Sequence, residues 1–169
     1  MKKDYPVEFC DALVTETRRR LFGEGIPRIA KCLDVLTEEE IWLKPNENSN
    51  SVGNIILHLC GNVRQWLGAG LGKLPKVRQR DEEFSTKGGF NKKEILEKLK
   101  ELQEMSESVL DKVTAEDLLT VHEVQVYQET GLSILVHVTE HFSYHVGQIT
   151  YFVKAKKDLD TKYYKEDLG

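Results

Sequence analysis

Three histidines recur at intervals of four residues near the end of the chain, at His137, His141 and His145. A fourth, His58, lies in an apolar segment of the first half. Since an α-helix turns about 100° per residue, side chains four positions apart lie above one another on one face. Two imidazoles stacked in this way can bind one divalent transition-metal ion, and a third from a neighbouring helix would complete a three-nitrogen site. The pattern therefore indicates metal-dependent chemistry.

The last predicted helix carries its histidines at different angles from its apolar stripe. His141 and His145 fall within roughly 60° of the stripe centre, whereas His137 falls about 100° away. Burying two polar rings in an apolar stripe costs free energy unless each ring finds a partner, and a metal ion would satisfy both. His58 lies on the edge of its own stripe, so it can point across at the last helix. The stripe consists of Val138, Phe142, Ile149 and Phe152.

Two other interpretations compete for these residues. Without a metal, the histidines would be hydrogen-bonded in a polar layer of the core. Alternatively, the run His137-Val-Thr-Glu140-His141 fits the inverted zincin pattern H-x-x-E-H, with Glu140 as general base. Helical geometry counts against the second interpretation, because Glu140 would project about 160° from the stripe centre, toward solvent. His122 lies in an extended segment and is expected at the surface.

Four long helical patterns would have to position the histidines. A four-helix bundle is the architecture that buries four such stripes, and bundle cores are where metal sites are built. We therefore predict an all-α fold, a four-helix bundle with a short extended or hairpin segment before the last helix. A long glycine-rich loop follows the second helix, and Pro27 predicts a kink or break in the first. The expected helices span about 7–36, 51–68, 91–112 and 132–154, with short capped turns at 37–42 and 114–119.

The two halves of the chain resemble each other in the order of their elements. A capped turn, a loop and a histidine-bearing helix occur in each, and the alignment pairs His58 with His137 and Asn62 with His141. This similarity suggests two helical hairpins related by a pseudo-twofold axis, with the second and fourth helices facing each other. We expect one domain over 1–169, with a core at about 5–155 and a charged tail at 156–169.

The composition excludes several classes of partner. The chain has 169 residues, of which 40% are hydrophobic and 31% charged, and its formal net charge is −4. No basic stripe with interleaved aromatic residues occurs, which argues against nucleic acid. No apolar run approaches the roughly 18 residues of a membrane span, and no signal peptide is recognisable. Three widely spaced cysteines are expected as free thiols, and together these features predict a cytoplasmic protein.

The segments PNENSNSVGNIILHLCGNVRQW, RQRDEEF and HFSYHVGQITY resemble the DinB/YfiT-like superfamily of metal-dependent enzymes. Its members are four-helix bundles with one histidine on the second helix and an H-x-x-x-H pair on the fourth. The resemblance implies His58, His141 and His145 as metal ligands, and places His137 in the second shell or at the surface. Gln148 would orient the ring of His145 or a bound water. Asn62 and Trp66 would line a pocket, and Arg80, Asp81 and Glu82 match an acidic loop near its mouth.

The resemblance also implies a class of function. Three imidazoles leave a coordination position open on one divalent ion, zinc or nickel, and an open position is typical of catalytic sites. A small-molecule substrate is expected, processed by a metal-dependent hydrolase or by a transferase that uses a low-molecular-weight thiol, as some superfamily members do. The alternative is a non-catalytic, stress-related binding module with a structural or vestigial metal. A homodimer is compatible with each interpretation.

Overall fold

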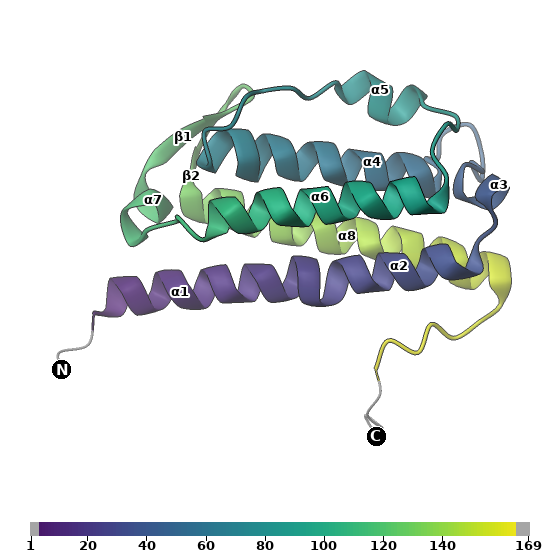
Figure 1. Cartoon of the computed structure of the whole chain (residues 1–169), viewed down its shortest axis with the longest axis horizontal. Coiled ribbons are helices and arrows are strands. Elements are labelled where there is room, and N and C mark those ends of the chain that lie inside the picture. The colour runs from purple at the N-terminus through teal and green to yellow at the C-terminus, as the bar shows by residue number, and fades with distance from the viewer. Residues whose placement is uncertain (1–3, 165–169) are drawn as a thin grey trace.

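The computed structural model describes residues 4–164. Four helical rods lie side by side along the long axis and enclose one apolar core (Figure 1). This arrangement confirms the predicted all-α bundle. The rods comprise α1 (Tyr5–Arg18), a π-helical segment η1 (Arg19–Gly25) and α2 (Ile26–Val35); α4 (Val52–Val63) and a second π-helical segment η2 (Arg64–Leu71); α6 (Lys92–Leu110); and α8 (Gly131–Lys157).

The α-helix of the first rod is interrupted over Arg19–Gly25, just before Pro27, where a kink or break was expected. Proline has no backbone N–H and cannot donate the next bond of an α-helix. The segment just before it, η1, is wound as a π-helix, in which the N–H of Ile26 donates to the carbonyl of Leu21, five residues earlier. The missing hydrogen bond is therefore accommodated by a local change of helical pitch, and the rod remains one unit.

Capping boxes set the starts of four helices, as the sequence predicted for the short turns. In each, a polar side chain accepts from the N–H three residues on, and that residue's side chain accepts from the N–H of the cap. These contacts satisfy backbone donors that the first helical turn leaves free. The boxes pair Thr37 with Glu40 at α3 (Glu38–Ile41), Ser51 with Asn54 at α4, Asn91 with Glu94 at α6, and Thr114 with Asp117 at α7 (Ala115–Leu119).

Two connections differ from simple loops. Strands β1 (Val121–Val124) and β2 (Tyr127–Thr130) form an antiparallel hairpin just before α8, which confirms the predicted extended segment. Residues 72–90, which we call the strap, cross over α4 (Figure 1) and contain a short helix, α5 (Arg80–Ser85). The loop predicted here is therefore partly helical, and its helix packs on α4.

The end of the described chain folds back onto the bundle. Lys157, the last residue of α8, forms an ion pair with Glu40 in which Nζ lies 2.6 Å from Oε2. The hydroxyl of Tyr163 lies 2.7 Å from Oγ1 of Thr150 on α8. The part of the predicted tail at 158–164 is thus packed against helices, and 165–169 lie outside the described residues.

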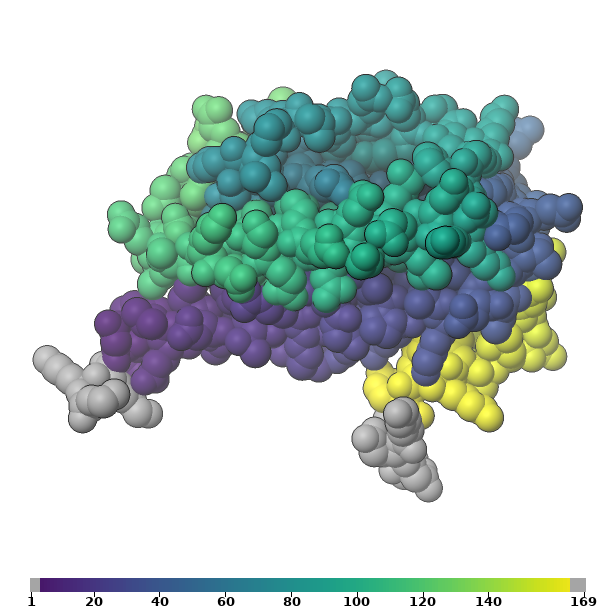
Figure 2. Space-filling model, in the orientation of Figure 1, coloured from purple at the N-terminus to yellow at the C-terminus, as the bar shows by residue number. Residues whose placement is uncertain are grey.

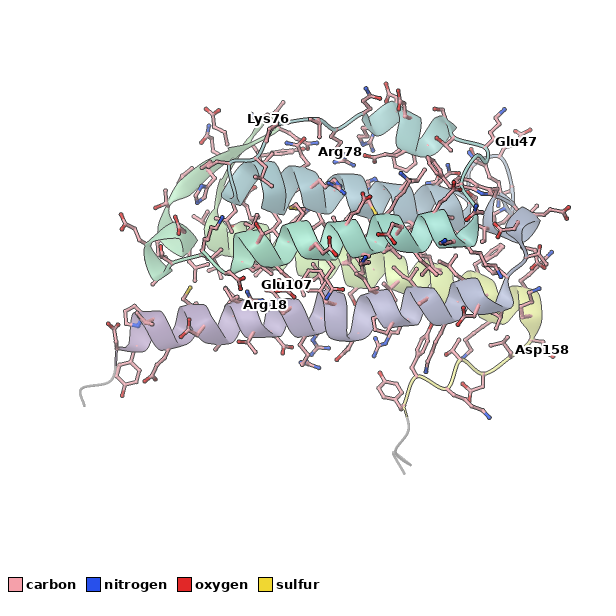
Figure 3. All side chains as sticks on the ribbon, in the orientation of Figure 1. Arg18, Glu47, Lys76, Arg78, Glu107 and Asp158 are labelled. Carbon is pink, nitrogen blue, oxygen red and sulfur yellow. The ribbon has the colours of Figure 1, made fainter. Side chains whose placement is uncertain are left out.

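Ion pairs also link the rods at the surface. Arg18 on α1 faces Glu107 on α6, with Nε 2.6 Å from Oε2 (Figure 3). Such half-exposed pairs contribute little to the free energy of unfolding, so burial of the apolar stripes is the main stabilising interaction between rods. Among the described helices, none combines the length and the hydropathy needed to cross a bilayer.

Candidate metal centre

Histidines from two facing helices meet in the middle of the bundle. His58 on α4 is buried, and His141 and His145 on α8 are half-buried. Nε2 of His58 lies 2.9 Å from Nε2 of His141, and one ring nitrogen from each of the three falls within 4.8 Å of the others. Two nitrogens bound to one tetrahedral zinc ion lie about 3.4 Å apart. The three nitrogens therefore lie close enough to one another to bind a single ion.

Hydrogen bonds to the opposite ring edges orient two of these imidazoles. Nδ1 of His58 lies 2.9 Å from Oε2 of Glu83, and Nδ1 of His145 lies 2.7 Å from Oε1 of Gln148. Nδ1–H of His145 donates to the amide oxygen. Nδ1 of His58 also lies 3.2 Å from Nη2 of Arg78, but it lies closer to the carboxylate, so we assign Nδ1–H as the donor to Glu83. Each Nε2 lone pair is then left free to bind an ion, which is the arrangement of ligand histidines in metal proteins.

Glu83 is itself held by Arg78. Nε of Arg78 lies 2.6 Å from Oε1 and Nη2 lies 2.8 Å from Oε2, so the guanidinium binds the carboxylate at two points. Both side chains are more than 90% buried. Burial raises the pKa of Glu83, but hydrogen bonds from Arg78 and His58 outweigh it and leave that pKa below its ordinary value. The carboxylate is therefore ionised and accepts the hydrogen bond from Nδ1–H of His58.

Asn54 attaches the strap to the helix that carries His58. Its side chain belongs to the capping box at the start of α4. The same amide donates to the carbonyl of Glu83 at 3.0 Å and to that of Thr86 at 2.7 Å. One buried residue thus both caps α4 and places α5, so that Glu83 reaches the ring of His58.

Three strap residues were expected at the site, and they lie next to Glu83, the strap residue that contacts His58. Arg80, Asp81 and Glu82 are all exposed. The guanidinium of Arg80 lies 5.0 Å from the centre of the Phe84 ring, which in turn is 4.9 Å from the ring of His58. The segment RQRDEEF, residues 78–84, was expected at the site, but Arg78 and Glu83 were not singled out within it, because in a charged loop no periodicity tells which carboxylate faces inward.

Asn62 and Trp66 contact His137, which in turn lies beside His141 of the candidate metal centre. The rings of Trp66 and His137 stack with centroids 3.7 Å apart, and Nδ2 of Asn62 lies 3.3 Å from Nε2 of His137. The ring of His137 lies nearly parallel to that of His141, with centroids 5.3 Å apart. Tyr127 of the hairpin stacks on the outer side of Trp66 at 6.1 Å. His137 therefore stacks with both Trp66 and His141, and His141 is one of the three candidate metal ligands.

Two contacts of His137, with Asn62 and Trp66, correspond in the alignment of the two halves to the contacts of His58 with His141 and His145. The alignment exchanges His58 with His137 and Asn62 with His141, and four residues further on it exchanges Trp66 with His145. The cluster of His58 with His141 and His145 thus has a counterpart in the cluster of His137 with Asn62 and Trp66. In the counterpart only one of three positions is a histidine.

Burial keeps the α8 imidazoles neutral. It lowers the pKa of His141 to about 4, with further lowering by the nearby His145 and His58. Burial also lowers the pKa values of His145 and His137, although the hydrogen bond that His145 donates to Gln148 partly opposes the shift at His145. A neutral imidazole is the form that binds a metal ion, so these residues need not lose a proton at neutral pH.

The positions of Glu140 and His122 can also be compared with the sequence-based expectations. Glu140 is exposed, which agrees with the helical argument against the inverted zincin pattern. His122 is 5% exposed and not at the surface as predicted. Its Nδ1 lies 2.9 Å from Nζ of Lys73, and its Nε2 lies 3.0 Å from the carbonyl of Asp117. The hairpin folds inward over the end of the bundle and covers this ring.

Comparison with known proteins supports the architecture. Residues 12–165 match the family model described as "Protein of unknown function (DUF1572)". The fold is similar to DinB-like proteins from Bacillus cereus (18% identity, 83% of this chain and 90% of that one, TM-score 0.64) and Bacillus subtilis (15%, 88% and 94%, 0.64). It is also similar to a conserved protein from Enterococcus faecalis (19%, 85% and 94%, 0.69). No curated protein matches the chain.

Proposed function

The chain belongs to the DUF1572 family of DinB-like proteins, and on that premise we propose that it is a metal-dependent enzyme acting on a small molecule. The metal would be one divalent ion, zinc or nickel, held by His58, His141 and His145. The observation that supports this proposal is the convergence of three ring nitrogens within 4.8 Å. Three protein ligands leave a coordination position open, as catalytic sites require.

The residues around this centre define what the chain itself contributes. When bound, the ion would supply Lewis acidity, which polarises a substrate oxygen or lowers the pKa of a water or thiol. Glu83 and Gln148 hold the ligand rings in the tautomer that offers Nε2. Trp66 and His137 form an aromatic wall on one side. Asn62 is buried, and its Oδ1 has no hydrogen-bond partner among the residues described.

We propose one of two reactions: hydrolysis of the substrate, or transfer of a low-molecular-weight thiol to the substrate. Both need an activated nucleophile beside an electrophilic substrate, and a three-histidine site with an open position serves either. The three cysteines are free and buried, so a thiol nucleophile would come from a co-substrate. We further propose a cytoplasmic location, without nucleic-acid or membrane partners, and a homodimer as the assembly.

The direct test is metal content per chain, measured by plasma mass spectrometry after loading untagged protein with zinc or nickel. We expect about one ion in the wild type and none in His58→Ala or His145→Ala. His122→Gln is the matched control, since it removes a buried histidine whose partners are Lys73 and Asp117. Full metal content in His145→Ala would overturn the proposed site.

A second measurement separates an enzyme from a binding module. Zinc-loaded wild type and His145→Ala would be assayed against panels of ester, amide and thiol-acceptor substrates. Turnover that follows metal content supports catalysis. A metal that raises the melting temperature strongly, with no turnover on any substrate, would instead favour a structural ion.

A further inference from the structure

A cavity of about 280 Å³ lies on the far side of the Arg78–Glu83 pair from His58. Its floor is formed by the outer face of α4 and η2, its roof by the strap, and one side by α6. Figure 2 shows the strap lying across α4 and above α6 on this face. Ligand pockets usually measure about 300–1,000 Å³, and this cavity lies just below that range, so only a compact small molecule would fit. Asn62, Trp66 and Gln148, which were expected to line a pocket, are not among its lining residues.

The lining combines apolar surface with an excess of positive charge. Leu57 on α4, Ala69 on η2 and Val77 on the strap supply apolar surface. Arg78 is neutralised by Glu83. The remaining charged lining residues are the cations Arg64, Lys76 and Lys98 and the anion Glu82, an excess of two positive charges in a protein whose formal charge is −4.

The cations at the wall are available to a ligand. Arg64 has one carboxylate partner, Glu101, at 3.4 Å, and both side chains are more than a third exposed, so that pair is weak. Nζ of Lys98 lies 4.2 Å from the centre of the Phe90 ring, and Phe90 also lines the cavity. The ammonium is therefore held at the cavity wall by an aromatic face and not by a carboxylate.

The strap segment that covers the cavity is held in place mainly by the side chain of Arg78. Residues 75–78 of the strap form no backbone–backbone hydrogen bond within the described part of the chain. Val77 is 72% exposed, and Lys76 and Arg78 lie on the strap above α4 (Figure 3). Arg78 fastens this segment through Glu83. A ligand can therefore enter beside the strap without breaking backbone pairing.

We propose that this cavity binds a small organic anion, a carboxylate, phosphate or sulfonate carried on a compact apolar body. The anionic group pairs with Arg64 and Lys98, and the apolar body packs against Leu57, Ala69 and Val77. Charge-assisted hydrogen bonds to two cations set the preference for an anion, and the apolar walls favour a body with little polarity. The cavity borders the proposed metal centre through Arg78 and Glu83, but neither Arg64 nor Lys98 has a hydrogen bond or ion pair with a ligand histidine among the residues described, so the anion can be tested on the metal-free chain.

The test is calorimetric titration of the metal-free full-length chain with naphthalene-2-carboxylate and with its neutral counterpart of the same shape, naphthalene-2-carboxamide. We expect one carboxylate site per chain, and binding of the carboxamide that is about tenfold weaker or undetectable. Arg64→Gln combined with Lys98→Gln should weaken carboxylate binding by about tenfold or more. Lys93→Gln combined with Lys100→Gln, an equal charge loss at exposed positions of the same helix α6, should leave it unchanged.

A cavity-filling variant separates binding in the cavity from binding to surface charge. Ala69→Leu keeps every charge and occupies the apolar wall, so it should weaken binding of the carboxylate, with folding checked by circular dichroism. Equal affinity for the carboxamide, undiminished binding by the Arg64→Gln, Lys98→Gln protein, or no binding of the carboxylate at millimolar concentration would each overturn the proposal.

Discussion

Oε2 of Glu83 lies 2.9 Å from Nδ1 of His58, on the ring edge opposite the one that faces His141. This contact joins the strap to the candidate metal centre, because it orients the imidazole by its far edge. Arg78 holds the carboxylate from behind. The geometry of the centre thus depends on a residue more than twenty positions from any candidate ligand along the chain.

Glu83→Gln should lower the affinity for zinc by about 10- to 100-fold, the usual effect of removing a hydrogen-bond partner of a metal-bound histidine. It also leaves the buried guanidinium of Arg78 without a charged partner, which should cost about 3 kcal/mol of the free energy of unfolding. Competition with a chromophoric chelator measures the first effect and urea unfolding the second. Glu82→Gln, at the exposed neighbouring position, is the control. Equal zinc affinity in the two variants would contradict the role of Glu83.

Gly61→Ala should disturb the centre without changing any polar group. A Cβ at Gly61 would lie next to Oε1 of Glu83 and 3.1 Å from Nε of Arg78, so the carboxylate would have to move away from His58. Gly147→Ala is the matched control, because a Cβ there meets no atom within 4 Å. Alanine is a better helix former than glycine by about 1 kcal/mol. We therefore expect thermal unfolding to show Gly147→Ala as more stable than wild type, and Gly61→Ala as less stable than Gly147→Ala with weaker zinc binding.

Acid should destabilise the metal-free protein between about pH 6.5 and pH 4. The pKa of His141 is lowered to about 4 in the folded chain, against about 6.5 in an unfolded one. In this window the unfolded chain binds more protons, so the free energy of unfolding falls as the pH falls. Melting temperatures in chelator at pH 7 and pH 5 would show the loss, and His141→Gln should reduce it. The same slope in both proteins would assign the effect to other groups.

The docked chain end should contribute measurably to stability. The hydroxyl of Tyr163 lies 2.7 Å from Oγ1 of Thr150 and 3.1 Å from Sγ of Cys32, and burial raises its pKa to about 12. Tyr163→Phe should therefore cost about 1 kcal/mol, the typical value of one hydrogen bond. Tyr164→Phe, at an exposed position, should cost nothing detectable. Chemical denaturation of both variants makes the comparison, and equal stability would mean that the Tyr163 hydroxyl does not stabilise the docked chain end.

The pseudo-twofold relation predicts that the metal centre can be moved. His137 contacts Asn62 and Trp66, the counterparts of His141 and His145. In a His145→Ala background without metal binding, adding Asn62→His and Trp66→His should restore about one zinc ion per chain, with His137 as third ligand. Adding His137→Ala to that protein is the control, and it should lose the ion again. Failure of a folded triple variant to bind zinc would show that the two clusters are not equivalent in geometry.

Local chemistry in the sequence was sufficient for the helices and for the face on which the histidines lie. Periodicity near 3.6 residues depends only on helical geometry, so His141 and His145 could be placed on one inward face from their spacing. Capping boxes such as Thr37 with Glu40 involve residues three apart, and they could be located in the same way. The grouping of His58 with this pair was implied by the resemblance to the DinB/YfiT-like superfamily, since apolar stripes alone do not specify which helices face each other.

Tertiary structure decided everything that depends on contacts between distant, non-periodic segments. Glu83 faces His58, while Arg80, Asp81 and Glu82 are exposed, because Asn54 anchors the strap in one register that no local pattern encodes. The burial of His122 depends on where the hairpin packs. The sequence by itself thus determined which residue types share a helix face. Only the packing of the chain decided which partners orient them, since hydrogen bonds across a fold depend on position in space and not on spacing along the chain.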